Sequence, residues 1–254
     1  MTGKPETRTY SPPEAYEACS YWGPRRESPE ECALRAMAFL NTLAACDPLL
    51  AHWNKIPKPR GRGRKTPLMP PALPVLTEAF QRGVNREPGG PPVEDLGLTV
   101  AAYNDGAREE YASLTMRCGS YAAGISNACV LTLPSEGSSG DRLLTTPMLT
   151  MLVGGMVSSW EPDWALAGSS AYRMQYQEPD SAPFSLGWLT YLSLRLGKVP
   201  ALPAPARIEP IGDKGMLIIL TPERFTVANS EHVALARRVR ELLASAGLMP
   251  PTTY

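Results

Sequence analysis

Histidine and cysteine supply most metal ligands and many nucleophiles, and this chain of 254 residues contains few of them. Its two histidines, His52 and His232, have no partner at HxH, HxxxH or HExxH spacing. Zinc normally takes several ligands drawn from histidine, cysteine and carboxylates. The sequence therefore predicts no metal site and no cofactor, and we interpret both histidines as ordinary surface or half-buried residues.

The five cysteines are odd in number and include no CxxC pair. In a chain of this length that pattern is typical of reduced thiols in a cytosol rather than of a disulfide framework. Cys32 and Cys46 fall in one expected helix, and Cys118 and Cys129 fall in strand-like segments. Buried free cysteines behave as small apolar side chains, which is our interpretation. A Cys–His nucleophile is the alternative, although no spacing supports it.

Motifs of nucleotide and ester chemistry are missing from the sequence. Residues 61–66 contain two glycines and a Lys-Thr pair, but not the GxxxxGK[ST] spacing of a phosphate-binding loop. No GxSxG elbow is present, and the Ser/Gly stretch 137–140 is interpreted as a linker. The residues therefore predict no catalytic centre. A hydrolase would have to gather a carboxylate pair or a cysteine from distant positions.

One patch of positive charge is pronounced, because residues 55–65 contain six basic side chains and no acidic one. These side chains belong to Lys55, Lys58, Arg60, Arg62, Arg64 and Lys65. Such a run can hold phosphates in a salt-dependent manner, but it has no aromatic residues on which bases could stack. We expect an exposed Pro/Gly loop over residues 55–72. A small nucleic-acid-binding regulator that uses residues 55–65 is the alternative function.

Two acid-rich segments are the candidate protein-binding sites. The first is the expected turn of a β-meander, with Asp105, Glu109 and Glu110. The second, residues 160–180, mixes acids with the Trp, Tyr and Arg that anchor protein interfaces. We assign Trp160 and Trp164 to the core, because they end a helical stripe and begin a strand. The other candidates in this segment are Glu161, Asp163, Tyr172, Arg173, Tyr176, Glu178 and Asp180.

Helix caps and apolar periodicity mark the elements that must position these residues. Ser28, Pro29 and Glu31 form an N-cap, a first-turn proline and a capping box for a helix that ends at Asp47-Pro48. Its expected buried stripe consists of Leu34, Met37, Leu40, Leu43 and Ala44. Further helices are expected at residues 75–82, 146–161 and 229–246. Gly154 and Gly155 in the third helix suggest that another element packs closely against it. The two glycines also leave open the possibility that the protein forms a homodimer.

Strand-like runs alternate with turn residues over the rest of the chain. They are residues 15–22, 96–103, 111–118, 127–133, 164–169, 188–194 and 216–221. Strands and helices are segregated rather than alternating, which predicts an α+β fold with a largely antiparallel β-sheet packed against several helices. We expect one domain over residues 1–254, with flexible ends at 1–14 and 249–254 and a polar connector at 135–141.

Composition bears on where the protein works. Basic and acidic residues balance at 25 each, so no overall field attracts nucleic acid or an anionic membrane. Residues 1–11 lack the apolar run of a signal peptide, and no apolar stretch is long enough to cross a bilayer. We therefore expect a soluble cytoplasmic protein with a protein partner, and neither a nucleic acid nor a membrane as its direct partner.

Four segments, taken in order, resemble a known family. They are YWGPRRES at 21–28, WEPDW at 160–164, GWLTYLS at 187–193 and LTPERF at 220–225. This set resembles the bacterial immunity protein 52 family of polymorphic toxin systems. The resemblance implies an intracellular, non-enzymatic α+β protein that protects its producer from a cognate toxin. The implied toxin is a nuclease with a restriction-endonuclease-like fold, often delivered by a type VI secretion system (T6SS). It brings no catalytic or toxin-contacting residues to place in this sequence.

Overall fold

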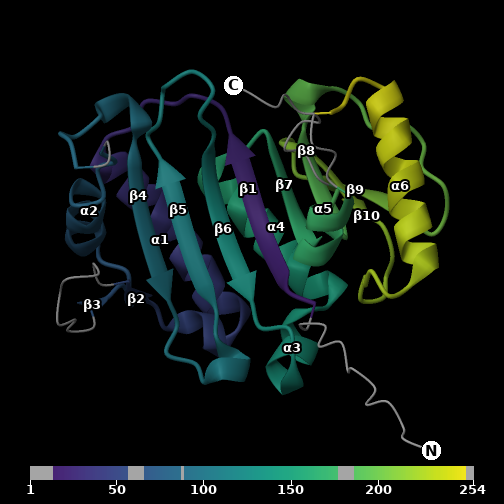
Figure 1. Cartoon of the computed structure of the whole chain (residues 1–254), viewed down its shortest axis with the longest axis horizontal. Helices are drawn as coiled ribbons and strands as arrows, with labels where there is room; N and C mark the ends of the chain where they lie inside the picture. Colours follow the sequence, from purple (N-terminus) through teal and green to yellow (C-terminus); the bar gives the residue numbers. More distant parts are fainter. Residues whose placement is uncertain (1–13, 57–65, 87–88, 177–185, 250–254) are drawn as a thin grey trace, which may run out of the picture.

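The computed structural model describes residues 14–56, 66–86, 89–176 and 186–249. These parts of the chain form a ten-stranded antiparallel sheet with helices on both faces (Figure 1). The sheet follows the order β3-β2-β4-β5-β6-β1-β7-β8-β10-β9. The strands are β1 Tyr16–Trp22, β2 Asn54–Lys55, β3 Thr66–Pro67, β4 Leu98–Tyr103, β5 Ser113–Cys118, β6 Asn127–Leu133, β7 Trp164–Ser169, β8 Leu189–Ser193, β9 Arg207–Ile211 and β10 Gly215–Ile219. The predicted α+β class with an antiparallel sheet is confirmed.

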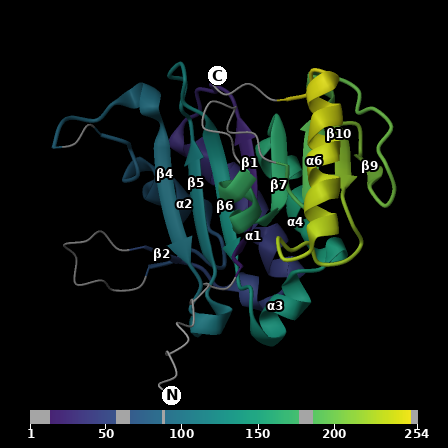
Figure 2. The ribbon, with the colours of Figure 1, turned by 45° about the vertical axis from the view of Figure 1, so that its right-hand side comes forward.

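The helices divide between the two faces of the sheet. They are α1 Pro29–Cys46, α2 Leu73–Gln81, α3 Gly137–Leu143, α4 Thr146–Trp160, α5 Ser170–Tyr176 and α6 Ser230–Ser245, joined by the short 3-10 turns η1 Pro48–Ala51, η2 Glu94–Leu96, η3 Arg108–Glu110 and η4 Leu194–Leu196. Helices α1, α2 and α4 cover one face, while α5 and α6 lie on the other (Figures 1 and 2). Side chains of β1 show the division, since Trp22 stacks on Trp160 of α4 and Glu17 pairs with Arg173 of α5.

The start of α1 forms as its sequence predicts. The Ser28 hydroxyl accepts a hydrogen bond from the backbone N–H of Glu31 at 3.2 Å, and the Ser28 N–H donates to the Glu31 carboxylate at 2.7 Å. This capping box satisfies two backbone N–H groups that the first helical turn leaves without partners. The same Glu31 carboxylate has a lowered pKa, chiefly because of that backbone hydrogen bond.

The predicted buried stripe of α1 is wrong at Leu34, and its members Met37 and Ala44 are only half-buried. Leu40 and Leu43 are buried, but Leu34 is 48% exposed. The buried side of the helix is set by six residues, Cys32, Ala33, Ala36, Phe39, Leu40 and Leu43. Each helical residue turns by about 100°, so Leu34, next to buried Ala33, points outward. In the first half of the helix the small residues Cys32, Ala33 and Ala36 are buried in place of Leu34, and the pattern of large apolar side chains did not predict this.

Close packing at Gly155 is confirmed. A Cβ atom at this position would lie 2.6 Å from the Thr42 side chain of α1, so α1 and α4 approach each other only because the residue is glycine. A Cβ at Gly154 would meet nothing within 4 Å. Gly155 therefore serves an internal contact between helices, which removes it from the support for a homodimer.

Five helices and strands were not predicted: β2 and β3 at the expected loop 55–72, and α3, α5 and β9. Helix α3 occupies the expected connector 135–141, α5 occupies a segment expected to be a loop, and β9 forms the edge of the sheet next to β10. In α3, a Cβ at Gly140 would lie 2.7 Å from the backbone of Ser135, so the glycine that weakens the helix also lets the chain pack. In β9, Pro210 is tolerated because an edge strand needs hydrogen-bond donors on one side only.

The expected flexible segments are tied down where the structure describes them. The Glu14 carboxylate accepts hydrogen bonds from the Thr226 hydroxyl and from the backbone N–H of Val227, and Met249 packs against the core. In the expected loop 55–72, β2 pairs with β3 and Leu68 is buried. Residues 57–65 and the outer parts of both ends lie outside the described residues.

Two tryptophans join the sheet to the helical layer. Trp22 and Trp160 stack with ring centroids 5.4 Å apart, and both are buried. Trp164 is also buried, so the assignment of Trp160 and Trp164 to the core is confirmed.

In the described part of the chain no single helix is long and apolar enough to span a membrane. Only the pair α3 and α4, which is bent by 68°, has sufficient length and apolarity when the two helices are taken together.

Candidate functional site

The strand register separates the ten candidate residues into several places. Tyr103 pairs with Ser113 where β4 ends and β5 begins, and this end of the sheet carries Asp105, Glu109 and Glu110. Glu161 and Asp163 lie at the opposite end, next to the Tyr21–Trp164 pair. Tyr172 and Arg173 lie on α5, which Tyr176 ends. The Tyr176 side chain, Glu178 and Asp180 lie outside the described residues.

An asparagine shapes the loop that carries the first three acids. The Asn104 side-chain amide donates to the carbonyl of Glu110 at 2.7 Å and its oxygen accepts from the N–H of Ala112 at 2.7 Å. A Cβ at Gly106 would lie 2.4 Å from the Glu110 carbonyl oxygen, so the two sides of the loop are in close contact. The loop of residues 104–112, called here the acidic loop, is thus held in one shape.

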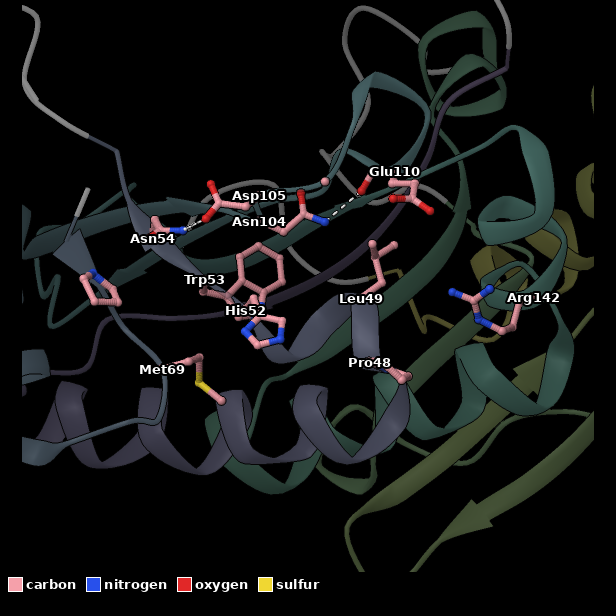
Figure 3. A pocket seen from close by; sticks show the side chains of 12 residues that line it. Pro48, Leu49, His52, Trp53, Asn54, Met69, Asn104, Asp105, Glu110 and Arg142 are labelled. Carbon is pink, nitrogen blue, oxygen red and sulfur yellow. Dashed lines mark hydrogen bonds between the residues drawn. The ribbon is translucent and has the colours of Figure 1, made fainter. Parts of the chain in front are cut away.

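A pocket of about 570 Å³ opens beside the acidic loop (Figure 3). Asn104, Asp105 and Glu110 lie along one side, with Trp53, His52 and Leu49 below them (Figure 3). The lining comes from η1 and β2, from β3 and the segment after it, from the acidic loop, and from α3. Its members are Pro48, Leu49, His52, Trp53, Asn54, Pro67, Met69, Asn104, Asp105, Gly106, Glu110 and Arg142.

Neutral donors orient two of the carboxylates at this pocket. The Asn54 amide donates to Asp105 at 2.9 Å, and the Ser139 hydroxyl of α3 donates to Glu110 at 3.2 Å. Because the Ser139 hydroxyl is neutral, it orients the Glu110 carboxylate without cancelling its charge. The acidic loop and residues 135–142 together contain five acidic and two basic residues, and a further basic residue, Arg224, lies 3.9 Å from Asp141, so these two segments are acidic by composition.

One of the two basic residues is already engaged. Arg142 donates to both carboxylate oxygens of the buried Asp47, at 2.5 and 3.1 Å, in a bidentate pair that joins α3 to the end of α1. Arg142 therefore forms part of the pocket wall. Sequence reasoning missed Asp47, Asn54, Asn104 and Arg142, and the only available signal was Asn104 at the start of the Asn-Asp-Gly turn.

The Asp47–Arg142 pair makes stability depend on pH. The hydrogen bond from Arg142 is the main cause that lowers the pKa of Asp47 below its ordinary value of 3.8. A carboxyl group whose pKa is lower in the folded state adds stability above its unfolded pKa and loses it as pH falls through the folded pKa. We expect urea unfolding to show an advantage of the native protein over Asp47→Asn at pH 7 that shrinks below about pH 4. A constant difference down to pH 2.5 would contradict the pairing.

The acids at the opposite end are neutralised internally. Arg35 lies 3.1 Å from Glu161, Lys214 lies 3.9 Å from it, and Arg195 lies 2.9 Å from Asp163. The hydrogen bond from Arg35 is the largest cause of the lowered pKa of Glu161. Asp163 also accepts from the N–H of Gly23 at 3.1 Å, which ties the end of β1 to the start of β7. These contacts indicate a structural role for both residues.

Helix α5 uses its two described candidates to attach itself to the sheet. Tyr172 is 4% exposed and meets Phe225 edge-on, so its ring is not presented to a partner. Arg173 lies 2.6 Å from the Glu17 carboxylate and 3.4 Å from the Tyr21 hydroxyl, both on the central strand β1. The expected interface loop is therefore, in its described part, a docked helix.

Nucleophilic and metal chemistry find little support in the described residues. Burial raises the pKa of the Cys19 thiol to about 12 and raises the pKa values of Cys118 and Cys129, so these thiols stay neutral near pH 7. Burial of Cys32, Cys118 and Cys129 agrees with their interpretation as small apolar side chains, whereas Cys46 is half-buried. Within the same residues, no group of three or more His, Cys, Asp or Glu could hold a metal ion.

The structure describes both histidines and one residue of the basic patch, Lys55. His52 is exposed at the pocket, as predicted, but the interpretation of His232 as a surface or half-buried residue is wrong: it is buried, and its Nδ1 accepts from the N–H of Thr226 at 3.2 Å. The Lys55 ammonium donates to the carbonyl of Ala79 at 3.3 Å, so this residue contacts α2. Lys58, Arg60, Arg62 and Arg64 lie outside the described residues, and so does Lys65.

Comparison with known proteins agrees with this architecture. The family model for immunity protein 52 matches residues 14–252, which is nearly the whole chain. The chain belongs to the immunity protein 52 family. The resemblance in the four sequence segments is thereby confirmed, and membership of this family implies binding to a cognate toxin and suggests an inhibitor rather than an enzyme.

A solved structure supports the fold of this family member. The Pseudomonas aeruginosa T6SS protein PA0821 superposes with a TM-score of 0.55, covering 91% of this chain and 72% of its own, at 13% sequence identity. At that identity the likeness concerns the fold alone. A search of curated proteins finds no match.

Proposed function

We propose that this protein binds and neutralises a cognate antibacterial toxin in the cytoplasm of the producing cell, without enzymatic activity of its own. Membership of the immunity protein 52 family supports the toxin-binding role. We further propose that the toxin is a nuclease with a restriction-endonuclease-like fold from a polymorphic toxin system, delivered by type VI secretion. The T6SS assignment of the structurally similar Pseudomonas protein is consistent with that route.

The observation that carries the proposal of a nuclease is the pair of exposed acids, Glu109 and Glu110, in the acidic loop. A nuclease cleft needs positive charge to hold the phosphates of its substrate. Glu109 and Glu110 are exposed, and no basic side chain among the described residues forms an ion pair with either. Such carboxylates can occupy the phosphate path, and opposite charges also accelerate the encounter of the two proteins.

The rigidity of the acidic loop favours tight binding. Because Asn104 and the Gly106–Glu110 contact fix the loop before binding, little conformational entropy is lost when the complex forms. A preorganised acidic loop could enter the cleft directly or block the substrate from beside it. We favour entry, because the loop lies at an end of the sheet rather than on the helix-covered faces (Figure 1).

The test uses the protein encoded by the neighbouring gene as the toxin. The two proteins are co-expressed and co-purified, the complex is titrated calorimetrically, and DNA or RNA cleavage by the toxin is measured with and without the inhibitor. We expect a one-to-one complex, rescue of growth and loss of cleavage. Absence of both binding and rescue would refute the toxin-binding role, whereas rescue from a toxin that cleaves no nucleic acid would refute only the nuclease assignment.

A further inference from the structure

The outer surface of helices α1 and α4 carries almost no charge. Helix α4 contains no charged residue, and α1 contains none after Arg35. Two large apolar side chains on this surface, Leu34 and Met151, are 48% and 49% exposed. Beyond the first turn of α1 the exposed residues of the two helices, called here the uncharged patch, are Leu34, Ala38, Asn41, Ala45, Pro147, Met151 and Ser158.

Helix α6, on the opposite face of the sheet, has a different outer surface. Its exposed residues include Glu231, Arg237, Arg238 and Glu241. Charged side chains are usual on the outward face of a helix that meets only water. Because both helical layers cover the same sheet, the absence of charge needs a cause that is specific to α1 and α4.

The exposed residues of α1 and α4 form one continuous surface. Gly155 of α4 lies against Thr42 of α1, and the Arg35 guanidinium donates to the carbonyl of Ser159 at 3.0 Å. The two helices therefore lie side by side and antiparallel. Residues one turn away from that contact flank it on both helices, namely Ala38 and Ala45 on α1 and Met151 and Ser158 on α4.

Charged residues border the uncharged patch rather than interrupt it. Glu30 and Glu31 lie at the start of α1 and Glu161 at the end of α4, while the ion pair of Glu78 with Arg82 belongs to α2, which lies beside α1 (Figure 1). A weakly charged centre with a charged margin is the arrangement found in protein interfaces.

We propose that the uncharged patch is the contact surface of a homodimer. In a twofold dimer each residue close to the axis faces its own copy, so a charge there would meet the same charge. A patch without charges avoids this repulsion, whereas it offers no complement to the basic cleft proposed for the toxin. Two antiparallel helix pairs would then pack as a layer of four helices between the two sheets.

The size of the uncharged patch predicts a weak dimer. Helices of 18 and 15 residues are about 27 and 22 Å long, and with a diameter of about 10 Å they cover roughly 500 Å² on each copy. The resulting total of about 1,000 Å² lies at the lower limit for a biological interface. We therefore expect a Kd in the micromolar range. The acidic loop lies at an end of the sheet and stays free in such a dimer.

Sedimentation velocity of the full-length protein measures the association. We expect the average mass to rise from 27.5 kDa at low micromolar concentration toward twice that value at high micromolar concentration. Met151→Glu and Ala38→Glu should each raise the Kd of the dimer by about tenfold or more, because each places like charges on both sides of the interface. The matched controls, Met174→Glu of α5 and Ala234→Glu of α6, change exposed residues on the other face and should leave the Kd unchanged.

The controls and the toxin decide between the possible occupants. Far-UV circular dichroism establishes that each variant is folded. A native protein that stays monomeric at high concentration would overturn the proposal, and so would a Kd that responds equally in the variants and their controls. If the native protein is monomeric and Met151→Glu weakens binding to the neighbouring-gene toxin, the patch contacts the toxin and the homodimer is refuted. None of these outcomes refutes the proposed function, which depends on toxin binding by the native protein.

Discussion

Replacing both Glu109 and Glu110 by lysine is expected to raise the Kd for the toxin by about 100-fold, which corresponds to about 3 kcal/mol. The change reverses two exposed charges in the acidic loop and places cations where we propose that a basic cleft docks. Like charges across an interface cost affinity and also slow the encounter. Calorimetry gives the Kd, and stopped-flow mixing at several salt concentrations gives the association rate.

The matched control is the double variant Glu30→Lys, Glu241→Lys. It changes the net charge by the same amount, and both residues are exposed and lie outside the lining of the pocket. We expect its affinity to stay close to that of the native protein. Equal losses in both double variants would mean that only overall charge matters, and the acidic loop would then lose its assignment as the contact surface.

Replacing Trp160 by alanine is expected to lower the free energy of unfolding by about 3–5 kcal/mol. The side chain is fully buried and stacks on Trp22, so its removal leaves a cavity between α4 and the central strand β1. Domains are commonly stable by only about 5–15 kcal/mol, and this single change uses a large share of that margin. Urea unfolding followed by far-UV circular dichroism measures the loss without depending on tryptophan fluorescence.

Leu34→Ala is the matched control for that prediction, because it removes a large apolar side chain that is 48% exposed. Surface substitutions of this kind usually change stability by less than about 0.5 kcal/mol. A loss near that of Trp160→Ala would mean that Leu34 is buried in solution, as its place in the apolar period first suggested. A small effect in Trp160→Ala would contradict the stacked tryptophan pair.

Local signals predicted most of the regular structure. The capping box of α1 and the alternating strands β4, β5 and β6 form where their sequences indicate, because each depends on contacts close in sequence or on strict apolar periodicity. Helix α3 escaped prediction since its glycines and serines oppose a helix, and it exists through long-range contacts such as Arg142 with Asp47. Strand β9 escaped because proline argues against a strand unless the strand is known to lie at an edge.

The candidate site was predicted less completely, because the sequence does not show which acidic residues are paired with basic residues in the fold. The sequence showed that Glu109 and Glu161 are both acids in turns, but the charge of Glu161 is compensated by Arg35, which lies more than 100 residues away in the chain. The same applies to Arg173, whose partner Glu17 comes from the first strand. Only the fold distinguishes a carboxylate that stabilises the protein from one that faces a partner. Asn54 was missed because its contact with Asp105 depends on the pairing of β2 with β4, whereas Asn104 forms hydrogen bonds within its own loop that the turn signal alone did not specify.

The central place of β1 has a consequence for the timing of protection. Among the ten described strands β1 is synthesised first, yet its neighbours β6 and β7 are complete only at Leu133 and Ser169. At about 5–20 residues per second, synthesis of the intervening chain takes roughly 7–30 s. The Tyr16 hydroxyl bonds to the carbonyl of Phe225, so the last contacts of the strand wait still longer. Under the proposed function, a cell that makes this protein only after the toxin arrives would stay unprotected for that interval, which favours a standing supply of folded protein.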